Sequence, residues 1–188
     1  MIMKGTHVKE LSVARANVGP VDQGGPVIRL EAWTEADLSL LRAANTPEMT
    51  AHLGGPETEA KLIGRHRRYL RDRDPGAGLM FAVVLPDGQR AGIIGYWERT
   101  WRDQPVYETG WSVMPGFQGR GIATAAARAV AERARAQHRR RYLHAFPAAD
   151  HPASNAICRK AGFTLLGETD FEYPPGTVMR CNDWRLEL

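Results

Sequence analysis

The sequence predicts a single α/β domain of the α+β kind, in which helices flank a central, mixed but mostly antiparallel sheet. Apolar side chains recur with strand spacing in some segments and with helix spacing in others. Residues 79–85 and 91–97 are two apolar runs joined by a turn at residues 86–88, which predicts a hairpin. Residues 113–124 lead from an apolar strand through a glycine-rich turn into an alanine-rich helix.

The length of 188 residues allows one domain with a well-buried core and is short for two. We expect this domain to cover residues 27–188. Residues 1–26 contain two glycine–proline clusters and predict a weakly structured leader. The leader has no signal-peptide pattern, and no apolar run reaches the roughly 18 residues that a membrane span needs. A cytoplasmic location is therefore the default expectation.

Each element follows from its own pattern. Thr34 and Asp37 have the spacing of a capping box, Gly162 closes the last predicted helix, and the basic residues 138–141 suit a helix carboxyl end. A Pro-Pro-Gly turn at residues 173–176 joins the last two strands. Strands are expected at residues 27–33, 79–85, 91–97, 106–113, 142–146, 163–171 and 178–188, and helices at 34–45, 57–71, 122–137 and 152–161.

The glycine-rich turn predicts an anion site. Gly116, Gly119 and Gly121 can adopt backbone angles that turn successive N–H groups toward one ligand. The helix that follows adds N–H groups without intrahelical partners and the positive end of its dipole. The P-loop pattern does not match, because no lysine follows a glycine here, and Thr124 stands where the dinucleotide fingerprint requires glycine.

The pattern that does match is Gln-x-x-Gly-x-Ala, formed by Gln118, Gly121 and Ala123. It resembles the acetyl-CoA pyrophosphate loop of the GNAT superfamily of N-acetyltransferases. The later stretch 151–163 resembles a second family motif, and Glu-x-Gly-Trp before the loop is similar to the branch of ribosomal-protein alanine N-acetyltransferases. The resemblance implies the GNAT fold, with the sheet splayed between its fourth and fifth strands, and acetyl-CoA as cosubstrate without a metal.

The resemblance also implies the residues that hold the cofactor. His151 stands where the family has an asparagine that contacts the pantetheine arm, and we expect Asn155, one helical turn later, to supply the lost contact. The expected cofactor-binding set is Trp111, Ser112, Val113, Gln118, Gly119, Arg120, Gly121, Ile122, Ala123, Thr124, His151 and Asn155.

Glu108 is the candidate general base, since it lies on the strand before the glycine loop and matches a family glutamate. Many relatives use a tyrosine as general acid at the position of Cys158. Cys158 is then either a catalytic proton donor or a small packed residue. Ser154 is the alternative donor, and it is equally suited to cap the helix that follows it.

The expected reaction is acetyl transfer from acetyl-CoA to a primary amine, either a peptide amino terminus or a small-molecule amine, by direct attack in a ternary complex. The acceptor should bind near the two early helices, the loop 100–104 and the last strands. Aromatic and carboxylate candidates for that region are His52, Tyr69, Trp97, Trp101 and Tyr173, with Glu98, Asp103 and Glu172 as partners of a cationic acceptor.

Two other functions stay open. A chain that binds coenzyme A without catalysis, as a sensor or interaction module, would fit the changed asparagine and tyrosine positions. An adaptor for nucleic acid or an acidic protein would use the basic runs 65–68 and 138–141. The formal charge of +4, from 25 basic and 21 acidic residues, suits anionic ligands without indicating nucleic acid. The two cysteines lack metal-ligand spacing, and a homodimer is expected only because many relatives form one.

Overall fold

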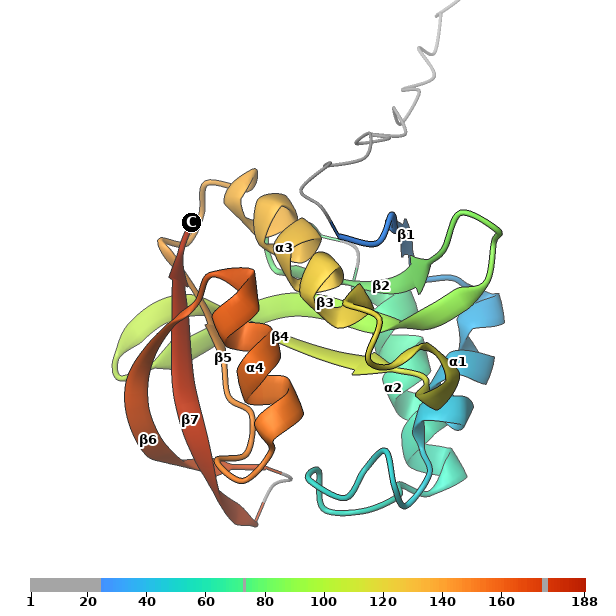
Figure 1. Ribbon diagram of the computed structural model, residues 1–188. Helices are drawn as coiled ribbons and strands as arrows, with labels where there is room; N and C mark the ends of the chain where they lie inside the picture. The colour runs from blue at the N-terminus through green and yellow to red at the C-terminus, as the bar shows by residue number, and fades with distance from the viewer. Residues whose placement is uncertain (1–24, 73, 174–175) are drawn as a thin grey trace, which may run out of the picture.

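The fold is described by a computed structural model over residues 25–72, 74–173 and 176–188; the predicted leader up to residue 24 and two prolines of the predicted last turn lie outside the described residues. The described chain forms a seven-stranded sheet of order β1-β2-β3-β4-β5-β7-β6 with helices on both faces (Figure 1). Its elements are β1 (Arg29–Ala32), the 3-10 helix η1 (Glu35–Asp37), α1 (Leu38–Ala44), α2 (Glu59–Arg71), β2 (Gly78–Val84), β3 (Arg90–Trp101), β4 (Gln104–Val113), the 3-10 helix η2 (Pro115–Phe117), α3 (Ile122–Arg135), β5 (Tyr142–Ala145), α4 (Pro152–Ala161), β6 (Thr164–Glu172) and β7 (Val178–Glu187). The predicted order of strands and helices is confirmed.

The sheet is antiparallel except between β4 and β5, which run parallel. These two strands pair only at Tyr107 with Leu143 and at Glu108 with His144. Residues 109–113 of β4 continue beyond that point without β5 alongside. The predicted splay between the fourth and fifth strands is therefore present, and we call the point after Glu108 and His144 the fork.

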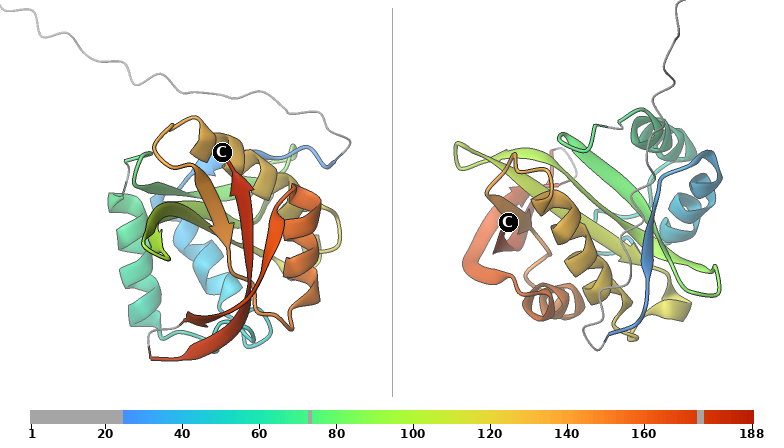
Figure 2. Two further views of the ribbon diagram at one scale, coloured as in Figure 1. Left: turned by 90° about the vertical axis from the view of Figure 1, so that its left-hand side faces the viewer. Right: turned by 90° about the horizontal axis from the view of Figure 1, so that it is seen from above.

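The two faces of the sheet carry different layers. Helices α3 and α4 cover one face, and α1 and α2 cover the other (Figure 2). Because side chains alternate along a strand, Tyr107 enters the core under α3 while Glu108 points to the opposite face. We call this second face, shared by α1 and α2, the acceptor face.

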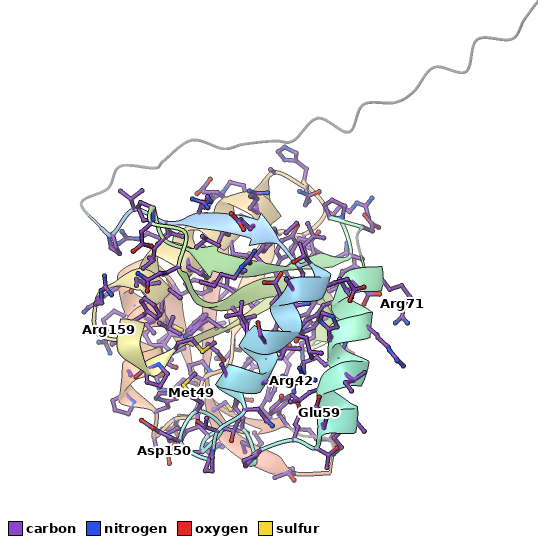
Figure 3. The ribbon with its side chains drawn as sticks, turned by 90° about the vertical axis from the view of Figure 1, so that its right-hand side faces the viewer. Arg42, Met49, Glu59, Arg71, Asp150 and Arg159 are labelled. Carbon is purple, nitrogen blue, oxygen red and sulfur yellow. The ribbon has the colours of Figure 1, made fainter. Side chains whose placement is uncertain are left out.

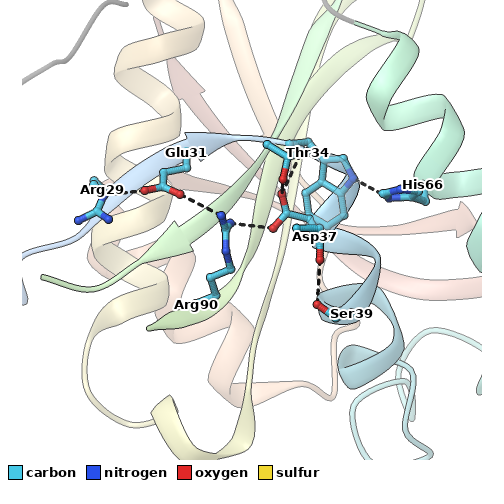
Figure 4. A network of polar contacts seen from close by, with 9 residues as sticks. Arg29, Glu31, Thr34, Asp37, Ser39, His66 and Arg90 are labelled. Atoms are coloured by element: carbon cyan, nitrogen blue, oxygen red, sulfur yellow. Dashed lines mark hydrogen bonds and ion pairs between the residues drawn. The ribbon is translucent and has the colours of Figure 1, made fainter. Parts of the chain in front are cut away.

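A buried carboxylate fixes the first helical segment to the sheet. Asp37 has no exposed surface, and its Oδ2 accepts hydrogen bonds of 2.7 Å from both the backbone N–H and the hydroxyl of Thr34. Its Oδ1 accepts from Arg90 of β3 at 2.7 Å, and Arg90 also donates to Glu31 of β1 (Figure 4). The predicted capping box is confirmed, and its acid has the further role of tying η1 to β3.

We expect Asp37→Ala to lower the free energy of unfolding by about 3 kcal/mol, because it removes a buried acceptor and leaves Arg90 without that charge partner. Urea unfolding would measure the loss. Ser39→Ala is the control, since Ser39 is exposed and donates only to the Ala36 carbonyl. Equal effects of the two substitutions would contradict this role for Asp37.

Helices α3 and α4 are capped by different residues. Gly121, with φ of 76°, is the N-cap of α3, and Gly162, with φ of 95°, closes α4 as predicted. The N-cap of α4 is His151, with Pro152 in its first turn. The expectation that Ser154 caps this helix is therefore wrong, because the helix begins two residues earlier at Pro152.

Candidate active site

The fork leaves polar backbone available for a ligand. Beyond Glu108, the main-chain groups of residues 109–113 that face β5 have no strand partner among the described residues. Trp111 and Ser112 are half-buried on this edge, and Val113 ends it. Buried peptide groups need hydrogen-bond partners. An extended ligand with amide groups can therefore form the hydrogen bonds that β5 would form here if it continued alongside β4.

The glycine loop presents several amides at the next position along the chain. Gly119 and Gly121 adopt left-handed φ values of 72° and 76°, whereas Gly116 does not. The first intrahelical bond of α3 runs from the Ala125 N–H to the Gly121 carbonyl, so the amides of residues 122–124 precede the helical ladder. No side chain caps this end, and its first turn has no acidic residue. A Cβ placed at Gly119 would find no atom within 4 Å, so the loop has room for a bound group. The backbone thus fits the pyrophosphate of acetyl-CoA.

Some side chains of the glycine loop bond within the protein, and others are exposed. The Gln118 amide donates to the Val113 carbonyl at 2.9 Å and thereby closes the end of β4 onto the loop. Arg120 is exposed, with its guanidinium carbon 5.7 Å from the centre of the Phe117 ring. Thr124 is half-buried, and the Ile122 side chain is in the core, which leaves its backbone N–H as the group it can offer. Contacts of Gln118, Arg120 and Thr124 with phosphate stay predictions.

The segment between α1 and α2 contacts both motifs that border the fork. Its Met49 sulfur lies 3.6 Å from the Gln118 amide nitrogen, and its His52 pairs with Asp150 at 3.3 Å (Figure 3). The His52 ring also stacks on His151, with centroids 4.3 Å apart. Burial and the neighbouring His52 lower the pKa of His151, so His151 is neutral at pH 7 and can exchange one hydrogen bond with an amide.

Asn155 has every hydrogen-bonding position filled within the protein. Its Nδ2 donates to the carbonyls of Ala148 and His151, both at 2.9 Å. Its Oδ1 accepts from Asn182 at 2.7 Å and from Trp184 at 2.8 Å. An amide side chain has two donor hydrogens and two acceptor positions, so none is left for the pantetheine arm. The geometry assigns Asn155 to joining α4 to β7 and does not favour the expected cofactor contact.

We expect Asn155→Ala to lower the free energy of unfolding by about 2–4 kcal/mol, because four bonds of a buried side chain are lost together. Acetyl-CoA affinity, corrected for the folded fraction, should stay close to wild type. Urea unfolding and calorimetric titration of the same sample would measure both. A stable variant that binds acetyl-CoA much more weakly would reinstate the cofactor contact.

The two candidate proton donors occupy different environments. Cys158 has no exposed surface, belongs to the main core, and its pKa is raised to about 12 by burial. Its thiol has no surface at which to meet a substrate, so the geometry favours the packing role. Ser154 is half-buried in the first turn of α4, and its hydroxyl has no hydrogen-bond partner among the described residues. Ser154 is thus the better-placed donor of the two.

Glu108 lies at the fork on the acceptor face and is 9% exposed. Burial raises its pKa, while the Arg99 guanidinium, which donates to its carboxylate at 2.6 Å, opposes the rise. Arg99 in turn packs over the Phe171 ring at 4.3 Å and lies beside Phe146. The carboxylate is therefore more basic than an ordinary glutamate, although one of its oxygens already accepts a hydrogen bond.

The acceptor face brings together only part of the aromatic set expected from the sequence. A Cβ at Gly110 would lie 3.1 Å from the Trp97 ring, so the missing side chain lets this indole cover β4 beside Glu108. Burial raises the pKa of Tyr69, the cations of Arg65 and Arg68 oppose that rise, and Tyr173 adds to it. Trp101 packs instead with Phe146 and Phe171.

The carboxylates expected to bind a cationic acceptor do not converge. Glu98 points to the α3 side of the sheet and pairs with Arg140. Glu172 accepts the Gly176 N–H at 2.8 Å, and Asp103 is in the β3–β4 turn with φ of 62°. Strand alternation explains the direction of the Glu98 side chain, because the neighbouring Trp97 side chain points to the acceptor face.

Several arginines of the two basic runs are paired with carboxylates. Arg139, Arg140 and Arg141 pair with Asp74, Glu98 and Glu187 respectively. In the first run, His66 is buried, accepts from the Trp33 indole at 3.1 Å and contacts Glu35 through its other nitrogen. Arg65 pairs with Glu57. These pairings weigh against the adaptor function.

Sequence reasoning missed three residues at the fork: Arg99, His144 and Asp183. They lie on β3, β5 and β7, far apart in the chain, and no local motif contains them. Strand alternation could have placed Arg99 on the face of Glu108, but the β4–β5–β7 pairing was needed to find the others. Within the described residues, no cluster of His, Cys, Asp and Glu suits a metal ion, and no helix is both long and apolar enough to span a membrane.

The comparisons with known proteins agree with this geometry. The family model for the GNAT acetyltransferase domain matches residues 28–164. No protein of curated function matches significantly. The structure of spermidine N-acetyltransferase from Vibrio cholerae with CoA and spermine aligns with a TM-score of 0.70 at 15% identity, over 85% of this chain and 95% of that one. The structure of RimJ from Mycobacterium smegmatis in complex with CoA-disulfide aligns with a TM-score of 0.70 at 17% identity, over 86% of this chain and 82% of that one.

A third solved structure, from Salmonella typhimurium, is an acetyltransferase that modifies the N-terminal serine of ribosomal protein L7/L12. It aligns with a TM-score of 0.70 at 18% identity, over 86% of this chain and 95% of that one. Identities this low show a shared fold, whereas the family match covers most of the chain. The protein therefore belongs to the GNAT acetyltransferase family and is an acetyl-CoA-dependent N-acyltransferase.

Proposed function

We propose that the protein transfers the acetyl group of acetyl-CoA to a primary amine, with Glu108 as general base. The observation that carries this proposal is the position of Glu108 at the last pair before the fork. There its carboxylate faces the acceptor side of the sheet while the free edge of β4 and the glycine loop lie immediately beyond. The acceptor is a peptide amino terminus or a small-molecule amine.

Acetyl-CoA supplies the thioester carbonyl carbon that the amine attacks. The free edge at residues 109–113 holds the amide-bearing arm in an extended form, and the loop amides with the α3 amino end hold the pyrophosphate. Glu108 removes a proton from the acceptor ammonium, for which its raised pKa is suited. The resulting neutral amine is then held next to the thioester, which replaces a bimolecular encounter by an intramolecular one.

Ser154 completes the proposal as the donor toward the departing thiolate. Its hydroxyl is in the first turn of α4, which follows β5, the strand on the other side of the fork from β4. A hydroxyl has a proton to donate and needs no shifted pKa if it relays one from water. Ser154→Ala is thus expected to slow turnover less than removal of Glu108.

Thermal unfolding with acetyl-CoA and with coenzyme A, followed by thiol release on the same sample, tests the proposal. The acceptor panel contains amino-terminal peptides, amino acids, polyamines and aminoglycosides. Stabilisation that rises with ligand concentration, together with thiol release from some acceptors, is the expected result. Stabilisation without release from any acceptor would favour the sensor, and no stabilisation would contradict the assignment of the glycine loop.

A further inference from the structure

A pocket of about 200 Å³ opens on the acceptor face at the end of β4 that lies away from the glycine loop. Gln104 and Val106 of β4 form one side of it, and Arg185 of β7 lies on another. Its lining also includes His144 and Asp183. The pocket thus reaches from the surface to the residue that pairs with Glu108 at the fork.

His144 and Asp183 form a buried pair in this lining. The two residues are 4% and 1% exposed, and the His144 Nδ1 lies 2.7 Å from Asp183 Oδ1. The Trp101 indole donates to the other oxygen at 2.9 Å. Burial acts to raise the pKa of Asp183, but the hydrogen bonds from His144 and Trp101 outweigh it and hold that pKa below its ordinary value.

An ionised carboxylate only accepts hydrogen bonds, so the proton of the neutral imidazole must be on Nδ1. The Nε2 atom then carries the lone pair, and it has no hydrogen-bond partner among the described residues. This is the tautomer that can take up a proton at Nε2 while Asp183 stabilises the imidazolium. The pair therefore has the arrangement of a histidine prepared to accept a proton.

His144 is also the neighbour of Glu108 that can receive a proton. The two residues are register partners in parallel strands, so their side chains leave the sheet side by side on the acceptor face. On its other side Glu108 meets Arg99, whose guanidinium has no acceptor atom for a proton. Of these two neighbours, only His144 has an atom that can accept a proton from Glu108.

We propose that His144, held by Asp183, takes the proton that Glu108 removes from the acceptor amine and releases it to water in this pocket. The inference rests on the proposed function of Glu108. Acetylation of an ammonium forms the C–N bond and breaks the C–S bond. One amine proton stays on the amide, one leaves on the coenzyme thiol, and the third must reach solvent in every turnover.

Charged groups of both signs surround His144. The carboxylates are Asp183 of β7 and Glu108 of β4. The guanidiniums are Arg102 and Arg185 in the pocket lining and Arg99 on β3. Tyr142, two residues earlier on β5, also lines the pocket. In this scheme Glu108 touches the substrate, and His144 and Asp183 act through it.

The test compares His144→Asn and His144→Ala with wild type in thiol release at saturating substrates. Asparagine keeps an N–H for Asp183 but cannot carry a proton, so the fold is preserved and turnover should fall about tenfold or more. In His144→Ala, the lost ring leaves room for free imidazole, which should restore turnover severalfold. Imidazole should not accelerate the wild type or Glu108→Gln. Tyr142→Phe, in the same lining, is the control and should keep the wild-type rate.

Each outcome decides one question. A wild-type rate in His144→Asn would overturn the role of His144, as would a slow His144→Ala that imidazole does not rescue. Circular dichroism and the melting temperature of each variant separate a slow enzyme from an unfolded one. Absence of thiol release by the wild type with every acceptor would instead contradict the function proposed for the whole site.

Discussion

Glu108→Gln is expected to lower kcat by about 100-fold or more, the usual contribution of a general base. Glutamine has the same shape, and its amide oxygen still accepts from Arg99, but it cannot take the proton of the acceptor. Acetyl-CoA affinity should change little, because in the proposed complex the cofactor binds to the β4 edge and the glycine loop rather than to this side chain. Pre-steady-state thiol release and calorimetric titration would separate the two quantities.

Glu98→Gln is the matched control, since Glu98 is on the adjacent strand but points to the other face and pairs with Arg140. It should keep kcat within about twofold, as surface substitutions usually have small effects. Equal rates for Glu108→Gln and wild type would remove Glu108 from the mechanism. An equal loss in both carboxylate variants would indicate a general electrostatic effect instead.

The proposed role of Glu108 predicts the direction in which kcat changes with pH. A base works only when it is deprotonated, so kcat should rise with pH through the pKa of Glu108 and then level off. Burial raises that pKa above the ordinary 4.5, so the rise should come at a higher pH than for an exposed glutamate. Glu108→Gln should lose this rise. A wild-type rate that falls as pH increases through that range would contradict the assignment.

Gly119→Asp is expected to weaken acetyl-CoA binding by about 100-fold, because it puts a negative charge where we propose that the pyrophosphate binds. Two unit charges about 4–6 Å apart repel by roughly 3–4 kcal/mol at an effective dielectric constant of 20. Aspartate tolerates the left-handed backbone of Gly119, and a Cβ there meets no atom within 4 Å. Steric strain therefore contributes little to the expected loss.

Gly119→Asn separates charge from shape. Asparagine has the same size and the same tolerance of positive φ, but it is neutral, so affinity should stay within a few-fold of wild type. The difference between the two variants should shrink as ionic strength rises. If both variants bind equally well, the anion does not lie at Gly119. If both bind equally poorly, side-chain volume rather than charge is responsible.

Most of the fold could be predicted because its signals are local. Strand and helix periods, the Thr34–Asp37 pair, Gly162 and the glycine loop each act within a few residues of chain. The predicted helix bounds agree closely with the observed ones for the same reason, and those of α4 are identical. Glu108 could be assigned to a face from strand alternation alone, since the phase of β4 follows from neighbouring residues.

Local pattern determined the elements, the position of the glycine loop and the face of Glu108. The tertiary structure decided which side chains have partners, because hydrogen bonds between strands join residues that are distant in the chain. The tertiary contacts occupy all four hydrogen-bonding positions of Asn155 and bury Cys158. They also place Arg99 on one side of Glu108, and His144 with Asp183 on the other. Burial and partners set whether a polar group can react, and both arise only when β4, β5 and β7 meet.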